Sequence, residues 1–316
     1  MWMPRAELPI LRARAELYRQ VRHFFAEREV LEVETPVLSA GATVDPNIDS
    51  FCADGLWLQT SPEFPMKRLL AAGSGAIYQI ARVFRRDEAG RFHNPEFSLL
   101  EWYRPGFDHR MLIDEVEALL WALGIASGAR YERLSYRDAF LRHAGLDPFT
   151  ASETALHAAV QALPGGAPEC DAVDAITRRD FYLDLLMSGC VGPALGQDTP
   201  LFLYDFPASQ AALARIRHDV PPVAERFELF WRGIELANGF HELSDADEQQ
   251  RRFEIDSRRR AEAGRAVPPY DRQLINALAH GLPDCAGVAL GLDRLLMLSL
   301  GLEAIGDVLA FDAPRA

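Results

Sequence analysis

Apolar residues near the N-terminus recur at the spacing of an amphipathic helix. Between Leu11 and Glu29 they fall on one helical stripe, with Arg and Glu between them. The stripe consists of Leu11, Leu17, Tyr18, Val21, Phe24 and Phe25. The β-branched stretch 30–35 follows and stops at Pro36, which is typical of a strand. We therefore expect a helix and then a strand at this end of the chain.

Other apolar or β-branched stretches predict further strands. They cover residues 77–84, 97–103, 201–204 and 226–240. The polar segment 85–95 joins the first two of them. Ser244 and Asp245 form a cap signal before a charged helix that is expected to end at Gly264.

Residues 146–198, in the middle of the chain, have the pattern of a helical insertion. Thr150 and Glu153 have capping-box spacing, and Pro164 and two glycines end the helix that follows. Its apolar positions are Leu156, Val160 and Leu163. Strands cluster toward both ends of the chain without βαβ alternation, so we expect an α+β fold with an antiparallel sheet flanked by helices. One domain is expected over residues 1–316.

Composition and charge narrow the class of protein. The 49% apolar and 25% charged residues are close to the average of soluble globular proteins. No apolar run approaches the roughly 20 residues that cross a bilayer, and no signal peptide is apparent, so a cytoplasmic location without membrane attachment is expected. The four cysteines form no CxxC pair, which suits a reducing compartment. A net charge of −13 argues against nucleic-acid binding as the main activity.

A predicted hairpin contains two acids that suit a cation. Arg232-Gly233 can form the turn between its strands, with Trp231 opposite Ile234. In that register Glu228 and Glu235 share one face as diagonal neighbours, where a Mg²⁺ ion would relieve their repulsion. The alternative is that both acids face solvent on an edge hairpin.

The sequence lacks the common nucleotide-binding loops, so side chains would have to hold ATP. There is no GxxxxGK[ST] loop, and residues 72–76 lack the third glycine of a dinucleotide fingerprint. Arg85 follows a strand and opens a polar hairpin, where its guanidinium could bind a phosphate. Arg294 begins a helix after the small residues around Gly291 and could reach a polyphosphate. A solvated turn and a tightly packed strand–helix joint are the respective alternatives.

Three acids could hold a cationic substrate. Glu63 follows Ser61 and Pro62, while Glu101 and Glu242 stand beside aromatic residues at strand ends. An acid inside a pocket needs a positive partner. Each could instead be an exposed strand end.

Together, and in this order, the segments resemble the three motifs of class II aminoacyl-tRNA synthetases. Residues 31–36 resemble motif 1, residues 84–101 motif 2, and residues 291–294 motif 3. The lysyl branch is most similar, through Thr60-Ser61-Pro62-Glu63 and Ile234–Leu243. The resemblance covers nearly the whole chain and implies the class II catalytic fold, ATP and Mg²⁺ as cofactors, and a homodimer formed through motif 1.

The resemblance also implies a role for each site residue. Arg85 would steady the α-phosphate and Arg294 the γ-phosphate, both as catalytic residues. Further ATP-binding residues would be Asp87, Glu88, His93, Asn94, Glu235, Leu236 and Gly291, with Glu228 and Glu235 as Mg²⁺ ligands. Substrate-binding residues would be Ser61, Pro62, Glu63, Glu101, Tyr103, Asn238, Phe240, Glu242 and Ala289. The motif usually has Glu where Asp87 stands, so whether Asp87 or Glu88 meets the adenine amine stays open.

One absence distinguishes the chain from lysyl-tRNA synthetases, which carry an N-terminal anticodon-binding OB-fold. The chain reaches motif 1 within its first ~40 residues, too few for such a barrel. It resembles the elongation factor P–lysine ligases, paralogues that join β-lysine to a lysine of elongation factor P. Ala289, where the synthetases usually have Gly, would favour (R)-β-lysine over lysine, and residues 101–105 and 206–210 also look like these ligases.

Two other functions fit the same resemblance. A truncated lysyl-tRNA synthetase would charge tRNA, and Ala289 and the acidic balance count against it. A non-catalytic paralogue would bind an amino acid as a sensor. Such a paralogue should have lost phosphate or metal residues, yet Arg85, Arg294, Glu228 and Glu235 are all present.

Overall fold

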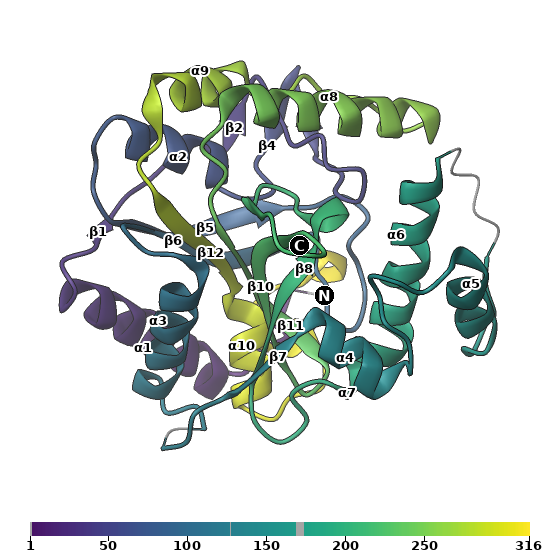
Figure 1. Ribbon diagram of the computed structural model, residues 1–316. Coiled ribbons are helices and arrows are strands. Elements are labelled where there is room, and N and C mark those ends of the chain that lie inside the picture. The colour runs from purple at the N-terminus through teal and green to yellow at the C-terminus, as the bar shows by residue number, and fades with distance from the viewer. Residues whose placement is uncertain (1, 127, 169–173) are drawn as a thin grey trace. The chain divides into compact units, whose positions relative to one another are not determined.

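The computed structural model describes residues 2–126, 128–168 and 174–316 (Figure 1). The chain forms two compact units. The first comprises Met1–Phe107, Ala118–Ile125 and Ser244–Ala316, and the second Asp108–Glu117 and Ala126–Leu243. Cys170 lies outside the described residues, and Cys52, Cys190 and Cys285 are free thiols.

The first unit contains a stretch of sheet with the strand order β1-β5-β6-β12. The strands of this sheet are β1 (Leu31–Glu32), β5 (Ile77–Phe84), β6 (Glu96–Pro105) and β12 (Cys285–Gly291). The strand β1 runs parallel to β5, while the β5–β6 and β6–β12 pairs are antiparallel. A small antiparallel sheet has the order β2-β4-β3, with β2 (Leu38–Ser39), β3 (Cys52–Ala53) and β4 (Leu56–Leu58).

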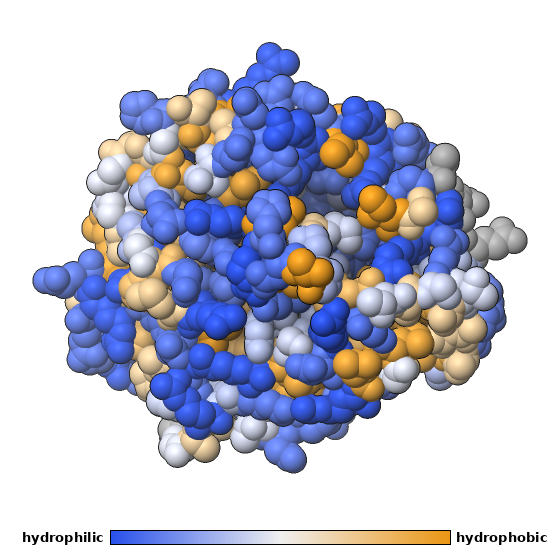
Figure 2. All heavy atoms as spheres, in the orientation of Figure 1, coloured by the Kyte–Doolittle hydropathy of each residue, from blue (hydrophilic) through white to orange (hydrophobic). Residues whose placement is uncertain are grey.

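Helices of the first unit follow the amphipathic patterns of the sequence. They are α1 (Leu8–Ala26), α2 (Glu63–Ala71), α8 (Ala246–Glu262), α9 (Arg272–Gly281) and α10 (Leu292–Ser299), with 3-10 turns η3 (Ile305–Val308) and η4 (Ala313–Arg315). The helix α9 packs against both α2 and α8, and α10 packs against α1 and β6. Hydrophilic residues prevail on the surface where α8 runs, along the top of the view in Figure 2.

An aromatic cluster attaches α1 to the sheet. The ring of Phe25 stacks on Tyr78 with 4.4 Å between centroids and meets the edge of Trp102 at 5.4 Å. All three residues are buried. Burying a side chain of this size contributes roughly 1.5–3 kcal/mol. The predicted stripe is thus confirmed as a core face, with Leu17, Val21, Phe24 and Phe25 buried.

The second unit has the strand order β11-β10-β8-β7, and β9 also pairs with β10. Its strands are β7 (Glu132–Ser135), β8 (Leu201–Pro207), β9 (Ile216–Arg217), β10 (Val223–Trp231) and β11 (Ile234–His241). The β7–β8 pair is parallel and the other pairs are antiparallel. Antiparallel pairing therefore dominates in both units, as the predicted α+β class requires.

Helices of the second unit lie mainly before β8. They are α4 (Tyr136–His143), α5 (Glu153–Gln161), α6 (Ala175–Leu186), the π-helix η1 (Met187–Val191), α7 (Gly192–Ala194) and the 3-10 turn η2 (Ala208–Gln210). Helix α3 (His109–Ala122) begins in this unit. In the unit's core, the ring of Tyr136 stacks on that of Phe140 with 4.6 Å between centroids, and its centroid lies 4.9 Å from that of Phe206. No helix in the described ranges combines the length and the hydrophobicity needed to span a bilayer.

Two local predictions were wrong. The expected strand 30–35 is shorter in the structure: only Leu31 and Glu32 form ladder pairs with β5, and beyond them the Val33 N–H still donates to the Tyr78 carbonyl at 2.9 Å. The cap of α5 is Ser152, whose side chain accepts a hydrogen bond from the Ala155 N–H at 3.2 Å. Thr150 lies in the preceding turn, where its N–H donates to the Asp147 carbonyl instead.

Candidate active site

In the first unit, Glu101 lies at the centre of a buried hydrogen-bonded group. The Ser61 hydroxyl donates to one carboxylate oxygen and the Tyr103 hydroxyl to the other, each at 2.7 Å. Tyr103 can do so because residues two apart on β6 project from the same face of the sheet. Burial, followed by the nearby charge of Glu63, raises the pKa of Glu101 to about 7. A carboxylate in this setting is suited to receive a cation.

Ala289 lies on the same face as Glu101. It is the partner of Glu101 on the neighbouring strand β12, and it packs against the small apolar cluster formed by Ala81, Val83 and Leu99. Its methyl group therefore occupies the layer beside the acid. Substrate atoms that approach Glu101 from this face would meet that methyl group.

Glu63, the first residue of α2, has a buried partner that the sequence reasoning missed. The Lys67 ammonium lies 2.7 Å from a Glu63 carboxylate oxygen, and Lys67 is only 1% exposed. Ser61 accepts a hydrogen bond from the Glu63 N–H at 3.0 Å and so links the two acids. Pro62, between Ser61 and Glu63 in the sequence, is the N-cap residue of α2. The signal for Lys67 was its i,i+4 spacing from Glu63, which is visible only once the helix is known.

Arg85 follows β5 and projects over an aromatic ring. Its guanidinium carbon lies 5.1 Å from the centroid of Phe97, and its Nε donates to the Thr60 carbonyl at 3.4 Å. A terminal nitrogen of Arg85 lies 3.5 Å from Glu88. The side chain of Asp87 is 75% exposed, that of Glu88 only 28%. The left-handed φ of 66° at Asp87 turns the backbone there. Of the two acids, Glu88 is the one beside Arg85.

Arg294 lies in the first turn of α10, beside the returning arm of the hairpin that follows β5. A terminal guanidinium nitrogen is 2.7 Å from Nε2 of His93, and Nε donates to the Phe92 carbonyl at 3.2 Å. The preceding Asp293 is buried; it accepts the Ser98 N–H at 2.8 Å and pairs with Arg14 at 2.5 Å. Asp293 thereby fixes the start of α10, a role that could not be predicted from its place in the sequence before Arg294.

Asn94 and Gly291, both predicted to bind ATP, have local structural roles. The Asn94 amide donates to the Glu96 carbonyl at 2.7 Å, and its oxygen accepts the Ala313 N–H at 3.0 Å. Gly291 ends β12 and serves as the N-cap residue of α10. Their contact with ATP stays a prediction.

In the second unit, the turn of the β10–β11 hairpin forms where it was predicted. Arg232 and Gly233 both have positive φ, 52° and 72°, as a type I′ turn requires. Trp231 pairs with Ile234 and Phe230 with Glu235, as expected. Beyond that, a bulge shifts the register. Glu228 consequently lies opposite Asn238, one residue further along β11 than an unbroken hairpin would give.

The bulge alters how the two acids meet without separating them. Burial, followed by the charge of Glu235, raises the pKa of Glu228 to about 8. Arg226 donates to Glu228, and its Nε donates to the Asn238 side-chain oxygen at 3.2 Å. Two carboxylates whose charges interact, one of them buried, fit the oxygen-ligand chemistry of Mg²⁺. Arg226, which the sequence reasoning also missed, lies on the face of Glu228 because residues two apart on a strand share a face.

The remaining predicted residues of this unit follow along β11. Leu236 and Phe240 are buried, and the Arg226 guanidinium carbon lies 5.9 Å from the Phe240 ring centroid. Glu242 is buried just beyond the strand and forms an isolated bridge with Ala214. A buried carboxylate here suits an ammonium group, as predicted for the far end of the substrate.

Comparisons with known proteins identify the family of the chain. The family model described as "tRNA synthetases class II (D, K and N)" matches residues 5–315. An elongation factor P–(R)-β-lysine ligase of Yersinia enterocolitica is 51% identical, and those of Salmonella typhi and Vibrio cholerae are each 50% identical. Each comparison covers 100% of this chain and 98% of the relative. The chain therefore belongs to the class II tRNA synthetase family of the D, K and N type, and it has that family's α+β fold.

Proposed function

We propose that this chain activates (R)-β-lysine, or lysine, with ATP and joins it to a lysine side chain of elongation factor P. The proposal rests on one observation: over its full length, the chain is 50–51% identical to proteins named elongation factor P–(R)-β-lysine ligase. The buried acids Glu101 and Glu242 support it, because a substrate with two amino groups needs carboxylates to receive them.

In the first half-reaction, a carboxylate oxygen of the amino acid attacks the α-phosphorus of ATP. The bond from that phosphorus to the bridging oxygen of the β-phosphate breaks, which yields an aminoacyl-adenylate and pyrophosphate. Arg85 steadies the α-phosphate and Arg294 the γ-phosphate, while His93 orients the guanidinium of Arg294. The position of Glu88 beside Arg85 favours it over Asp87 as the acid that accepts from the adenine amine. Leu236 would pack against the nucleotide.

Glu228 and Glu235 are the residues that would hold Mg²⁺. The ion would supply positive charge to the polyphosphate during its transfer. Burial, followed by the charge of Glu235, raises the pKa of Glu228, which is the setting in which a cation would stabilise the ionised carboxylate. Arg226 keeps the Glu228 carboxylate in place from one side.

In the second half-reaction, the uncharged amine of an elongation factor P lysine attacks the adenylate carbonyl carbon. The bond from that carbon to the phosphate oxygen breaks, AMP leaves, the amine loses a proton, and an amide forms.

Glu63 would bind the substrate amine near the reacting carboxyl group. The distal ammonium would be bound by Glu101, Tyr103, Asn238 and Glu242. Ser61, Pro62 and Phe240 would also contact the substrate. A methyl group such as that of Ala289 shifts selectivity by about 1–3 kcal/mol, here toward the β-amino acid.

The proposal extends to the state and location of the protein. The net charge of −13 favours a protein acceptor over tRNA. Exposed apolar side chains in and directly after the segment that resembles motif 1, namely Leu31, Val37 and Leu38, support a homodimer. We also propose a single catalytic domain with a helical insertion at 146–198, and a cytoplasmic location.

The decisive test is the intact mass of elongation factor P after incubation with this chain, ATP, Mg²⁺ and (R)-β-lysine. We expect a mass gain of one lysyl residue that requires ATP and that Glu101→Gln abolishes. An unchanged mass, although ATP–pyrophosphate exchange demonstrates adenylate formation, would return tRNA to first place as acceptor. The absence of exchange with both lysine and (R)-β-lysine would favour the non-catalytic paralogue.

A further inference from the structure

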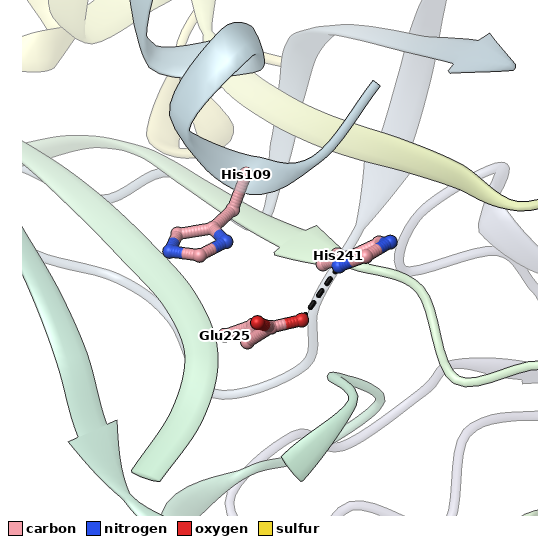
Figure 3. A group of neighbouring side chains, drawn as sticks. All are labelled: His109, Glu225 and His241. Carbon is pink, nitrogen blue, oxygen red and sulfur yellow. Dashed lines mark hydrogen bonds and ion pairs between the residues drawn. The ribbon is translucent and has the colours of Figure 1, made fainter. Parts of the chain in front are cut away.

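Two histidines and a glutamate outside the predicted active-site residues meet inside the second unit. His109 is the first residue of α3, Glu225 lies on β10, and His241 is the last residue of β11 (Figure 3). Their candidate ligand atoms all lie within 4.8 Å of one another. His109 and His241 are buried and Glu225 is half-buried. Residues far apart in the sequence thus bring three potential metal ligands to one point.

The imidazole of His109 lacks the hydrogen bonds that a buried ring normally makes. Among the described residues, neither of its buried nitrogens has a hydrogen-bond partner. The Asp205 carboxylate is 3.7 Å from Nε2, beyond hydrogen-bond distance. Buried polar groups are nearly always satisfied, and leaving one unsatisfied costs roughly 1–3 kcal/mol. The arrangement calls for a further partner at this ring.

The carboxylate of Glu225 is oriented by an arginine on its other side. Nδ1 of His241 lies 2.6 Å from Oε2 of Glu225, while Arg217 lies 3.6 Å from Oε1. The same guanidinium pairs with Asp205 and Asp219, each at 2.7 Å. Arg217 therefore lies beside Oε1 of Glu225, while Oε2 of Glu225 lies against His241. Supporting contacts of this kind are typical around the ligands of a metal ion.

We propose that His109, Glu225 and His241 bind a divalent transition metal ion of the Zn²⁺ type. Imidazole and carboxylate ligands suit Zn²⁺, with metal–ligand distances of about 2.0–2.2 Å. Ligand atoms around such an ion lie roughly 3.3–3.5 Å apart. The Glu225–His241 contact would open slightly and the His109 ring would move inward, both by side-chain rotation. Asp205 or a water molecule would complete the coordination.

This site differs in chemistry from the pair Glu228 and Glu235. Two imidazoles favour a transition metal, whereas carboxylates alone suit Mg²⁺. An ion bound here would tie the first turn of α3 to β10 and β11. Since His241 directly precedes Glu242, it would also fix the backbone that carries a predicted substrate-binding acid. Its role is structural, and it is independent of the proposed function.

Metal binding by the wild-type protein is the first test. The untagged full-length chain is stripped with a chelator, returned to buffer with excess Mg²⁺, and titrated with Zn²⁺ or with Co²⁺. We expect one equivalent to bind, the melting temperature to rise, and Co²⁺ to give the visible absorption of a four-coordinate nitrogen–oxygen site. Failure to bind either ion overturns the proposal, and so does a sulfur-to-cobalt charge-transfer band, which would indicate cysteine ligands.

A matched pair of variants assigns the ligands. His109→Gln should weaken Zn²⁺ binding by at least about tenfold. His280→Gln removes an exposed histidine of the first unit and should leave the affinity unchanged. Glu225→Gln should repeat the His109→Gln result and provides the comparison if His109→Gln does not fold. Equal affinity in all of these variants would overturn the proposal.

Discussion

The carboxyl group of Glu101 keeps its proton to a higher pH than an exposed glutamate does. Burial raises its pKa to about 7, and the charge of Glu63 adds to the rise. The hydrogen bonds from Ser61 and Tyr103 oppose it, because they stabilise the ionised form. A cationic substrate requires that ionised form. The affinity of the pocket for an ammonium group is therefore tied to pH.

The Michaelis constant for (R)-β-lysine should rise as the pH falls through the pKa of Glu101. Tyr103→Phe removes a hydrogen bond that lowers this pKa, so the rise should begin at a higher pH in that variant. The measurement is the amino-acid KM from ATP–pyrophosphate exchange at pH values on both sides of about 7. A KM that is independent of pH in both proteins would contradict the assignment of Glu101 to the ammonium.

Lys67 and Glu63 form a pair whose disruption should be costly. Lys67→Met leaves the Glu63 carboxylate without its buried partner, and loss of one member of a buried pair costs on the order of 3 kcal/mol. Urea denaturation of the ligand-free protein measures the change in the free energy of unfolding. The double variant Lys67→Met with Glu63→Gln should recover part of the loss, because no unpaired charge remains. Equal losses in the single and double variants would show that packing, and not charge, dominates.

Among the structural elements, α5 offers a direct comparison of two capping residues. Ser152 makes the cap hydrogen bond, and Thr150 does not. We expect Ser152→Ala to lower the free energy of unfolding by about 1 kcal/mol and Thr150→Ala to leave it nearly unchanged. Thermal or urea unfolding of the two variants provides the measurement. A larger loss from Thr150→Ala would restore the capping box that the sequence suggested.

Elements with a strong periodic pattern could be predicted from the sequence, and their ends and registers less well. The span of β5, 77–84, was predicted to the residue, and the turn at Arg232-Gly233 was correct because Gly233 suits the positive φ of the second turn position. The bulge that places Glu228 opposite Asn238 left no sequence signal, since it depends on how β10 fits β8 and β11 together. Helix α2 was missed because only nine residues carry its pattern.

At the scale of the whole molecule, the site was predictable through its motifs and not through its contacts. Each candidate acid or arginine was ambiguous alone. The order of the motifs along the chain identified the same family as the family model that matches residues 5–315. Lys67, Arg226 and Asp293 escaped because they act on other protein side chains and contribute no recognisable ligand chemistry of their own. Positioning residues become visible only when the fold brings their partners together.

Dimer formation should depend on an exposed apolar residue of the segment that resembles motif 1. Leu31, which is 56% exposed, belongs to the segment that resembles motif 1, and the proposed homodimer would cover it. Leu31→Glu should therefore shift the chain from dimer to monomer, because a charge buried at an interface without a partner opposes association. Val267→Glu places the same charge at an exposed apolar residue outside that segment and should leave the dimer intact. Light scattering coupled to size-exclusion chromatography measures the mass of each protein. A monomeric wild-type chain would refute the dimer, and a Leu31→Glu dimer would move its interface elsewhere.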